Sequence, residues 1–136
     1  MQPPGHPSWP ALVPARPAEA LLGRRGELAE LRRTLGSARL VTLTGQGGIG
    51  KTALARAAAT DYERARHEHT CSVDLADLVD PDLLGHSVAS AFGVQLAVGA
   101  ATEDVAAAIA DRAGLLVLDG CESMLDAAVD LVSVLL

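Results

Sequence analysis

The chain has 136 residues, of which 49% are hydrophobic and only 2% aromatic, so one aliphatic core is the expected architecture. The formal net charge is −6, with ten basic and five acidic side chains in residues 1–66 but one and twelve in residues 67–136. The basic side chains are scattered without interleaved aromatics, no apolar stretch reaches membrane-span length, and no signal peptide opens the chain, which argues against nucleic-acid, membrane and secreted classes.

The first segment, residues 1–20, holds six of the seven prolines and is expected to be an irregular leader or linker. Residues 21–136 are expected to form the folded part. A helix is predicted over residues 26–36, because leucines recur there at helical spacing. Two cysteines, Cys71 and Cys121, fit a cytoplasmic protein with reduced thiols.

A strand is predicted over residues 40–44, and a helix is predicted to begin at Thr52, so the glycine-rich segment between them joins a strand to a helix. That segment fits the phosphate-binding P-loop pattern G-x-x-x-x-G-K-[ST]. Its lysine, Lys51, is the only one in the chain and is expected to reach the β- and γ-phosphates in a catalytic role. The predicted nucleotide-binding residues of this segment are Gly45, Gln46, Gly47, Gly48, Ile49, Gly50, Lys51, Thr52 and Ala53.

The remainder of the chain alternates strand and helix patterns. A second strand is predicted at residues 71–75, and Pro81 is placed in the first turn of a helix that continues to about residue 92. Residues 93–101 read as a loop, Thr102 as the N-cap of a helix ending near Arg112, residues 115–119 as a strand, and residues 125–136 as a last helix. This order predicts an α/β fold, the three-layer α/β/α P-loop NTPase class with a parallel sheet.

An aspartate ends the strand predicted at residues 115–119. The carboxyl ends of parallel strands meet at the ligand edge of such a sheet, so Asp119 is expected to face Thr52 and to hold Mg²⁺ with it. This is the Walker B interpretation; the alternative is an aspartate that only caps the next helix. The alternating His67, His69 and Cys71 could also hold a metal, but without a fourth ligand nearby, surface histidines are favoured.

The joint pattern of Leu22-Gly23-Arg24, the strand with its P-loop, and Leu118-Asp119-Gly120-Cys121-Glu122 resembles the STAND class of P-loop ATPases. The resemblance is closest to the NB-ARC-like modules of bacterial multidomain transcription regulators, and it covers roughly residues 18–136. It implies an ATP/ADP switch with Mg²⁺, closed with ADP and opened by ATP, in a protein with effector domains or self-association. Gly23 and Arg24 would line the adenine side of the pocket, although Arg24 could equally be a surface arginine.

Two departures from that family limit what is expected of catalysis. Gly120 stands where the family commonly has asparagine and where related ATPases have an acidic general base; Glu122 is the substitute candidate, or merely a glutamate in a first helical turn. Hydrolysis by a Mg²⁺-dependent ATPase is therefore less certain than binding. The strand that separates the first and Walker B strands in this class would follow residue 136, so the chain is expected to be the front part of a domain with marginal stability.

Three other functions compete with the ATP/ADP switch. A GTPase commonly reads guanine with Asn-Lys-x-Asp, but the chain has no asparagine and its single lysine lies in the P-loop. A small-molecule kinase would need lid arginines, and residues 67–136 offer only Arg112. A fragment acting only as an interaction module is the remaining alternative.

Overall fold

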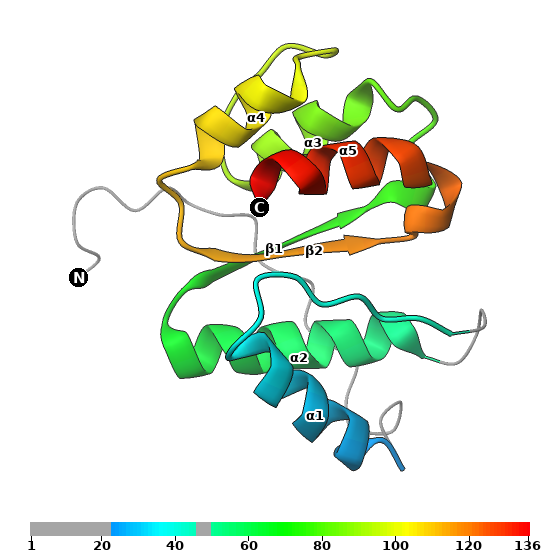
Figure 1. The fold of residues 1–136 in the computed structure, drawn as a ribbon, viewed down its shortest axis with the longest axis vertical. Coiled ribbons are helices and arrows are strands. Elements are labelled where there is room, and N and C mark those ends of the chain that lie inside the picture. Colours follow the sequence, from blue (N-terminus) through cyan, green and yellow to red (C-terminus); the bar gives the residue numbers. More distant parts are fainter. Residues whose placement is uncertain (1–22, 46–49) are drawn as a thin grey trace.

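The computed structural model of the chain describes residues 23–45 and 50–136. The leader or linker predicted at residues 1–20, and the roles predicted for Leu22, Gln46, Gly47, Gly48 and Ile49, concern residues outside this described part. The helices and strands, shown in Figure 1, are α1 (Arg25–Leu35), α2 (Lys51–Arg66), β1 (His69–Asp74), α3 (Leu83–Ala91), α4 (Thr102–Ile109), β2 (Gly114–Asp119) and α5 (Leu125–Leu135). A short 3₁₀ turn, η2 (Leu75–Asp77), follows β1 directly, and another, η3 (Cys121–Ser123), follows β2 after Gly120.

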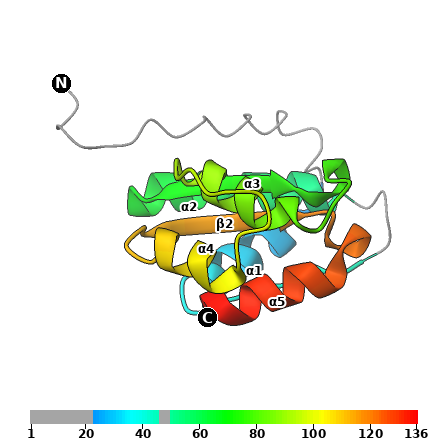
Figure 2. The same cartoon turned by 90° about the horizontal axis from the view of Figure 1, so that it is seen from above.

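The two strands form a parallel sheet in which His69 pairs with Gly114 and Asp74 with Asp119. Helices cover both faces, with α1 and α2 on one side and α3, α4 and α5 on the other (Figure 1). Seen from above, α3, α4 and α5 lie side by side (Figure 2). Parallel sheets need such cover because both their faces are apolar. The mixed α/β prediction with a parallel sheet is confirmed, and so are the strands predicted near residues 71–75 and 115–119.

The strand predicted at residues 40–44 is wrong, since this segment carries no strand in the structure. Its alternating apolar side chains do become partly buried, because Val41 and Leu43 pack against the core cluster of Leu31, Leu54 and Ala58 between α1 and α2. A strand, however, requires a neighbour that exchanges backbone hydrogen bonds with it. Among the described residues, β1 and β2 pair only with each other, so this extended segment has no ladder.

The larger core lies between the sheet and the layer of α3, α4 and α5. Its fully buried side chains are Leu75, Val88, Val105 and Leu131. Cys71 and Val73 of β1 also point into this core, whereas the intervening Ser72 is exposed, as the two-residue period of a strand requires. The larger core therefore fixes which face of β1 is left for α2.

The predicted helix boundaries need three corrections. Thr102 is the first residue of α4 and not its N-cap, which is Ala101. The Thr102 hydroxyl donates to the Glu103 carboxylate, and no side chain among the described residues accepts a capping hydrogen bond from the backbone N–H groups at this end of α4. Helix α4 ends at Ile109, short of Arg112. Pro81 lies in a turn, and α3 begins only at Leu83. No helix in the described part of the chain is long and apolar enough to cross a bilayer.

Candidate nucleotide-binding site

The start of α2 depends on a glycine in a left-handed conformation. Gly50 is the N-cap of α2 and has φ 82°, a value that costs a residue with a Cβ about 1–2 kcal/mol. The chain can therefore turn sharply from the loop into the helix. The backbone N–H groups of the first turn, which includes Lys51, Thr52 and Ala53, have no partner within the helix and can bind an anion.

The lysine of the loop spans its two ends. The Lys51 ammonium donates a hydrogen bond of 2.7 Å to the carbonyl oxygen of Gly45. Gly45 comes before residues 46–49 and Lys51 comes after them, so this hydrogen bond joins the two sides of the glycine-rich segment. The ammonium, on its flexible stem, lies where it can exchange this carbonyl for a phosphate oxygen.

Residues 52 and 119 meet across the sheet edge. The Thr52 hydroxyl donates a hydrogen bond of 2.7 Å to Oδ2 of Asp119. The other oxygen, Oδ1, accepts a 2.9 Å hydrogen bond from the backbone N–H of Gly120. The strands and α2 bring this about, because the carboxyl ends of β1 and β2 lie on the same side of the molecule as the beginning of α2 (Figure 1).

Arg24 lies beside the same loop. A Cβ placed on Gly50 would be 3.7 Å from Cζ of Arg24, so the guanidinium rests against the beginning of α2. Its Nη1 also lies 3.4 Å from Oε2 of Glu27, and 23% of the Arg24 side chain is exposed. Gly23, in the preceding turn, has φ 82° and no atom within 4 Å of an added Cβ. The structure thus places Arg24 beside Gly50, whereas an added Cβ on Gly23 would meet none of the described atoms within 4 Å.

Glu122 is not brought to the site by any hydrogen bond or ion pair with the described residues. It is exposed in η3, two residues after Gly120. Its charge is felt by the Cys121 thiol, whose pKa is raised first by burial and then by the carboxylates of Glu122 and Asp119. The thiol therefore stays protonated at neutral pH and is a poor nucleophile.

Asp74 lies near the site, although the sequence patterns did not predict a site role for it. Asp74 ends β1 as Asp119 ends β2, and the two are paired in register. A Cβ on Gly120 would be 3.2 Å from Oδ1 of Asp74 and 3.0 Å from the backbone nitrogen of Ala76. The signal in the sequence is an aspartate near the end of each predicted strand, Asp74 in residues 71–75 and Asp119 in residues 115–119.

The sequence offered one more possible metal site, and the structure separates its members. His67 ends α2, whereas Cys71 is buried in the larger core, where its thiol donates to the carbonyl of Ala91. Within residues 23–45 and 50–136 there is no group of three or more His, Cys, Asp or Glu side chains that could hold a metal ion.

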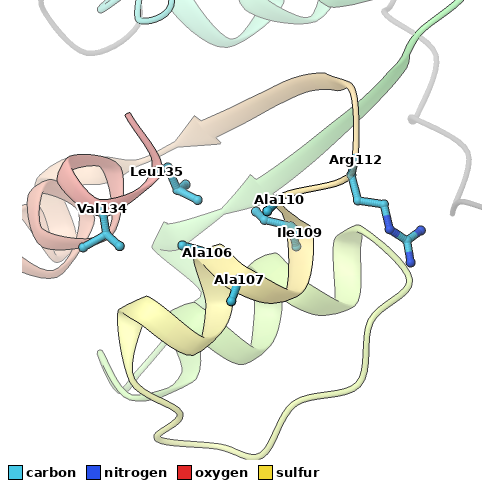
Figure 3. Close-up of a pocket in the computed structure, with 7 residues that line it drawn as sticks. All are labelled: Ala106, Ala107, Ile109, Ala110, Arg112, Val134 and Leu135. Atoms are coloured by element: carbon cyan, nitrogen blue, oxygen red, sulfur yellow. The ribbon is translucent and has the colours of Figure 1, made fainter.

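A hollow lies between α4 and α5 (Figure 3). Its lining is mostly apolar and consists of Ala106, Ala107, Ile109, Ala110, Arg112, Val134 and Leu135. Arg112 precedes β2, whereas Asp119 ends it, so this hollow is at the opposite end of the strand from the Thr52–Asp119 pair. It has no part in the candidate nucleotide site.

Comparison with known proteins gives one family and several longer relatives. The profile of the family described as "AAA domain" matches residues 32–135. An uncharacterized protein of Mycobacterium tuberculosis (strain ATCC 25618 / H37Rv) is 38% identical over 121 residues, which cover 86% of this chain and 30% of that protein. A protein of the same strain named "Putative HTH-type transcriptional regulator" is 40% identical over 107 residues, covering 78% of this chain and 12% of that protein. No solved structure matches the chain significantly.

Proposed function

Because the chain belongs to the AAA domain family, we propose that it is the ATP/ADP-binding part of a cytoplasmic nucleotide switch of the STAND, NB-ARC-like type. The observation that carries this proposal is the 2.7 Å hydrogen bond between Thr52 and Asp119, which are 67 residues apart in sequence. It joins the end of a P-loop to the end of the partly buried strand β2. In a P-loop ATPase these two positions hold the metal of the nucleotide.

The nucleotide phosphates would be held at the beginning of α2. The free N–H groups of its first turn and the positive end of its dipole favour an anion. Lys51 would release the Gly45 carbonyl and bind the β- and γ-phosphates. Arg24, which rests against Gly50, adds a second cation at the border of this loop, and its segment would line the adenine side.

The residues present also suit Mg²⁺. Thr52 and Asp119 offer a hydroxyl and a carboxylate, the hard oxygen ligands that this ion prefers. Their oxygens lie 2.7 Å apart, so one ion could be held by both residues in place of this hydrogen bond. The ion would supply charge neutralisation for the phosphates. Asp119 would stay oriented by the Gly120 N–H.

The switch role draws on the relatives. The chain spans about 12% of the relative named as a transcriptional regulator and 30% of the uncharacterized one. We propose that the nucleotide state of this module is read by effector domains or by self-association in such longer proteins. ADP would favour the closed state, and ATP the open one.

The test is a calorimetric titration of ADP, ATP and GDP, each with Mg²⁺, into the chain and into its Lys51→Ala variant. Arg56→Ala, a cation removed from the same helix one turn later, is the control. We expect ADP and ATP to bind more tightly than GDP, and Lys51→Ala alone to weaken binding at least tenfold. Tighter binding of GDP would replace the ATPase proposal, and equal binding by both variants would remove it.

A further inference from the structure

The two aspartates that end the strands lie on the face of the sheet that α2 covers. Cys71 and Val73 of β1 point into the larger core, on the side of α3, so Ser72 and Asp74 point the other way. Thr70 lies on the same face of β1 as Ser72 and Asp74, and its hydroxyl donates a 3.3 Å hydrogen bond to Glu63 of α2. Asp74 is therefore on the same face as Asp119, whose carboxylate accepts from Thr52 of α2.

The turns η2 and η3, which follow the two strands, are in hydrogen-bonding contact with one another. The Ser123 hydroxyl lies 3.2 Å from the carbonyl oxygen of Leu75 and 3.0 Å from that of Gly120. Oδ1 of Asp74 accepts a 3.0 Å hydrogen bond from the backbone N–H of Ala76, which fixes the carboxylate in the turn. Only one carboxylate oxygen is used in this way, so the other is not needed to hold the turn.

The resemblance to P-loop ATPases implies an acidic general base at position 120, and here that position is a glycine without a side chain. The space its Cβ would enter lies 3.2 Å from Oδ1 of Asp74. A Cβ at position 120 would crowd the turn of Asp74 and Ala76, at distances of 3.0–3.2 Å, so the glycine leaves room for this aspartate. The carboxylate missing from β2 is thus present beside it, supplied by the neighbouring strand.

We propose that Asp74 is the general base of ATP hydrolysis in this site, an inference that rests on the proposed nucleotide function. Its carboxylate accepts a proton from the attacking water while the water oxygen forms a bond to the γ-phosphorus. The bond between that phosphorus and the oxygen bridging to the β-phosphate breaks, and the electron pair leaves with ADP. The products are ADP and inorganic phosphate, and the proton passes to solvent.

The substitution that tests this role is Asp74→Asn, because asparagine keeps the oxygen that accepts from Ala76 and serves equally well in such a turn. A merely structural aspartate would tolerate this change, whereas a base would not. The matched control is Asp111→Asn, the same substitution at an exposed aspartate before β2, at the opposite end of the strand. Each variant is assayed for single-turnover ATP hydrolysis, for affinity toward Mg²⁺·ATP, and for melting temperature.

We expect Asp74→Asn to bind Mg²⁺·ATP and to melt like the original chain while hydrolysis falls by about 100-fold or more, the usual contribution of a general base. Asp111→Asn should match the original chain in all three. Hydrolysis at the original rate by Asp74→Asn would overturn the proposal, as would its loss in Glu122→Gln alone. If the original chain binds ATP but does not hydrolyse it, the proposal for Asp74 is overturned and the proposed nucleotide binding stands. If the original chain does not bind ATP, the proposal for Asp74 and the proposed nucleotide binding both fail.

Discussion

Replacing Gly120 by alanine should destabilise the protein more than replacing another glycine with the same backbone conformation. Gly120 has φ 70° and Gly99 has φ 79°, so both substitutions carry the left-handed cost of about 1–2 kcal/mol. They differ in their surroundings. A Cβ on Gly99 meets nothing within 4 Å, whereas one on Gly120 meets the Ala76 nitrogen at 3.0 Å and the Ala76 Cβ at 3.1 Å.

The Ala76 backbone cannot easily retreat, because its N–H donates to Asp74 and the turn is tied to η3. Overpacking of this kind costs about 1–3 kcal/mol, so Gly120→Ala should lose about 2–5 kcal/mol and Gly99→Ala about 1–2 kcal/mol. Any gain from a stiffer unfolded chain is the same for both and cancels in the difference. Urea unfolding followed by circular dichroism measures both values. Equal losses would refute the claim that the two strand-end turns are pressed together.

Two further substitutions test the packing and the buried thiol. Leu54→Ala, in the cluster between α1 and α2, should lower the free energy of unfolding by about 2–5 kcal/mol. The control Leu125→Ala should lower it by much less, because Leu125 is 58% exposed. Similar urea midpoints for the two variants would contradict the burial of Leu54 in that cluster. Burial, and then the charge of Glu63, raises the pKa of Cys71 from 9.0 to about 11. The native thiol holds its proton more tightly than the unfolded one, so its contribution to the free energy of unfolding should be fully present below pH 9 and should fall as the pH rises toward 11. Cys71→Ala should show a smaller fall. An unchanged pH profile of the unfolding midpoint in that variant would refute this.

The contact between Thr52 and Asp119 could be predicted because the two patterns that it joins are each local in sequence. A glycine loop before a helix and an aspartate after an apolar run are recognisable separately, and the rule that ligands gather at the carboxyl ends of parallel strands joins them. That reasoning placed Thr52 opposite Asp119, which the structure bears out as a hydrogen bond. Arg24 was ambiguous because no local pattern tells a surface arginine from one packed against Gly50.

The rest depends on contacts between distant segments. The apolar, β-branched run of residues 40–44 predicts a buried strand, but in the structure only Val41 and Leu43 are partly buried. A strand exists only where a neighbour pairs with it, and local pattern cannot supply that neighbour. The closeness of Asp74 to Gly120 follows from the register of β1 and β2, which places Asp74 beside Asp119. Register is set by the packing of both strands against the helices and is not written in either strand alone.

The most direct test of the account is the effect of Mg²⁺ on ADP affinity, measured by titration with the metal and with a chelator, in the original chain and in Thr52→Val. Valine nearly keeps the shape of threonine but removes the hydroxyl that now meets Asp119. We predict that Mg²⁺ tightens ADP binding at least tenfold in the original chain and has little effect in Thr52→Val. ADP binding that ignores Mg²⁺ in the original chain, or an equal response in both proteins, would contradict the assignment of this sheet edge as a metal–nucleotide site.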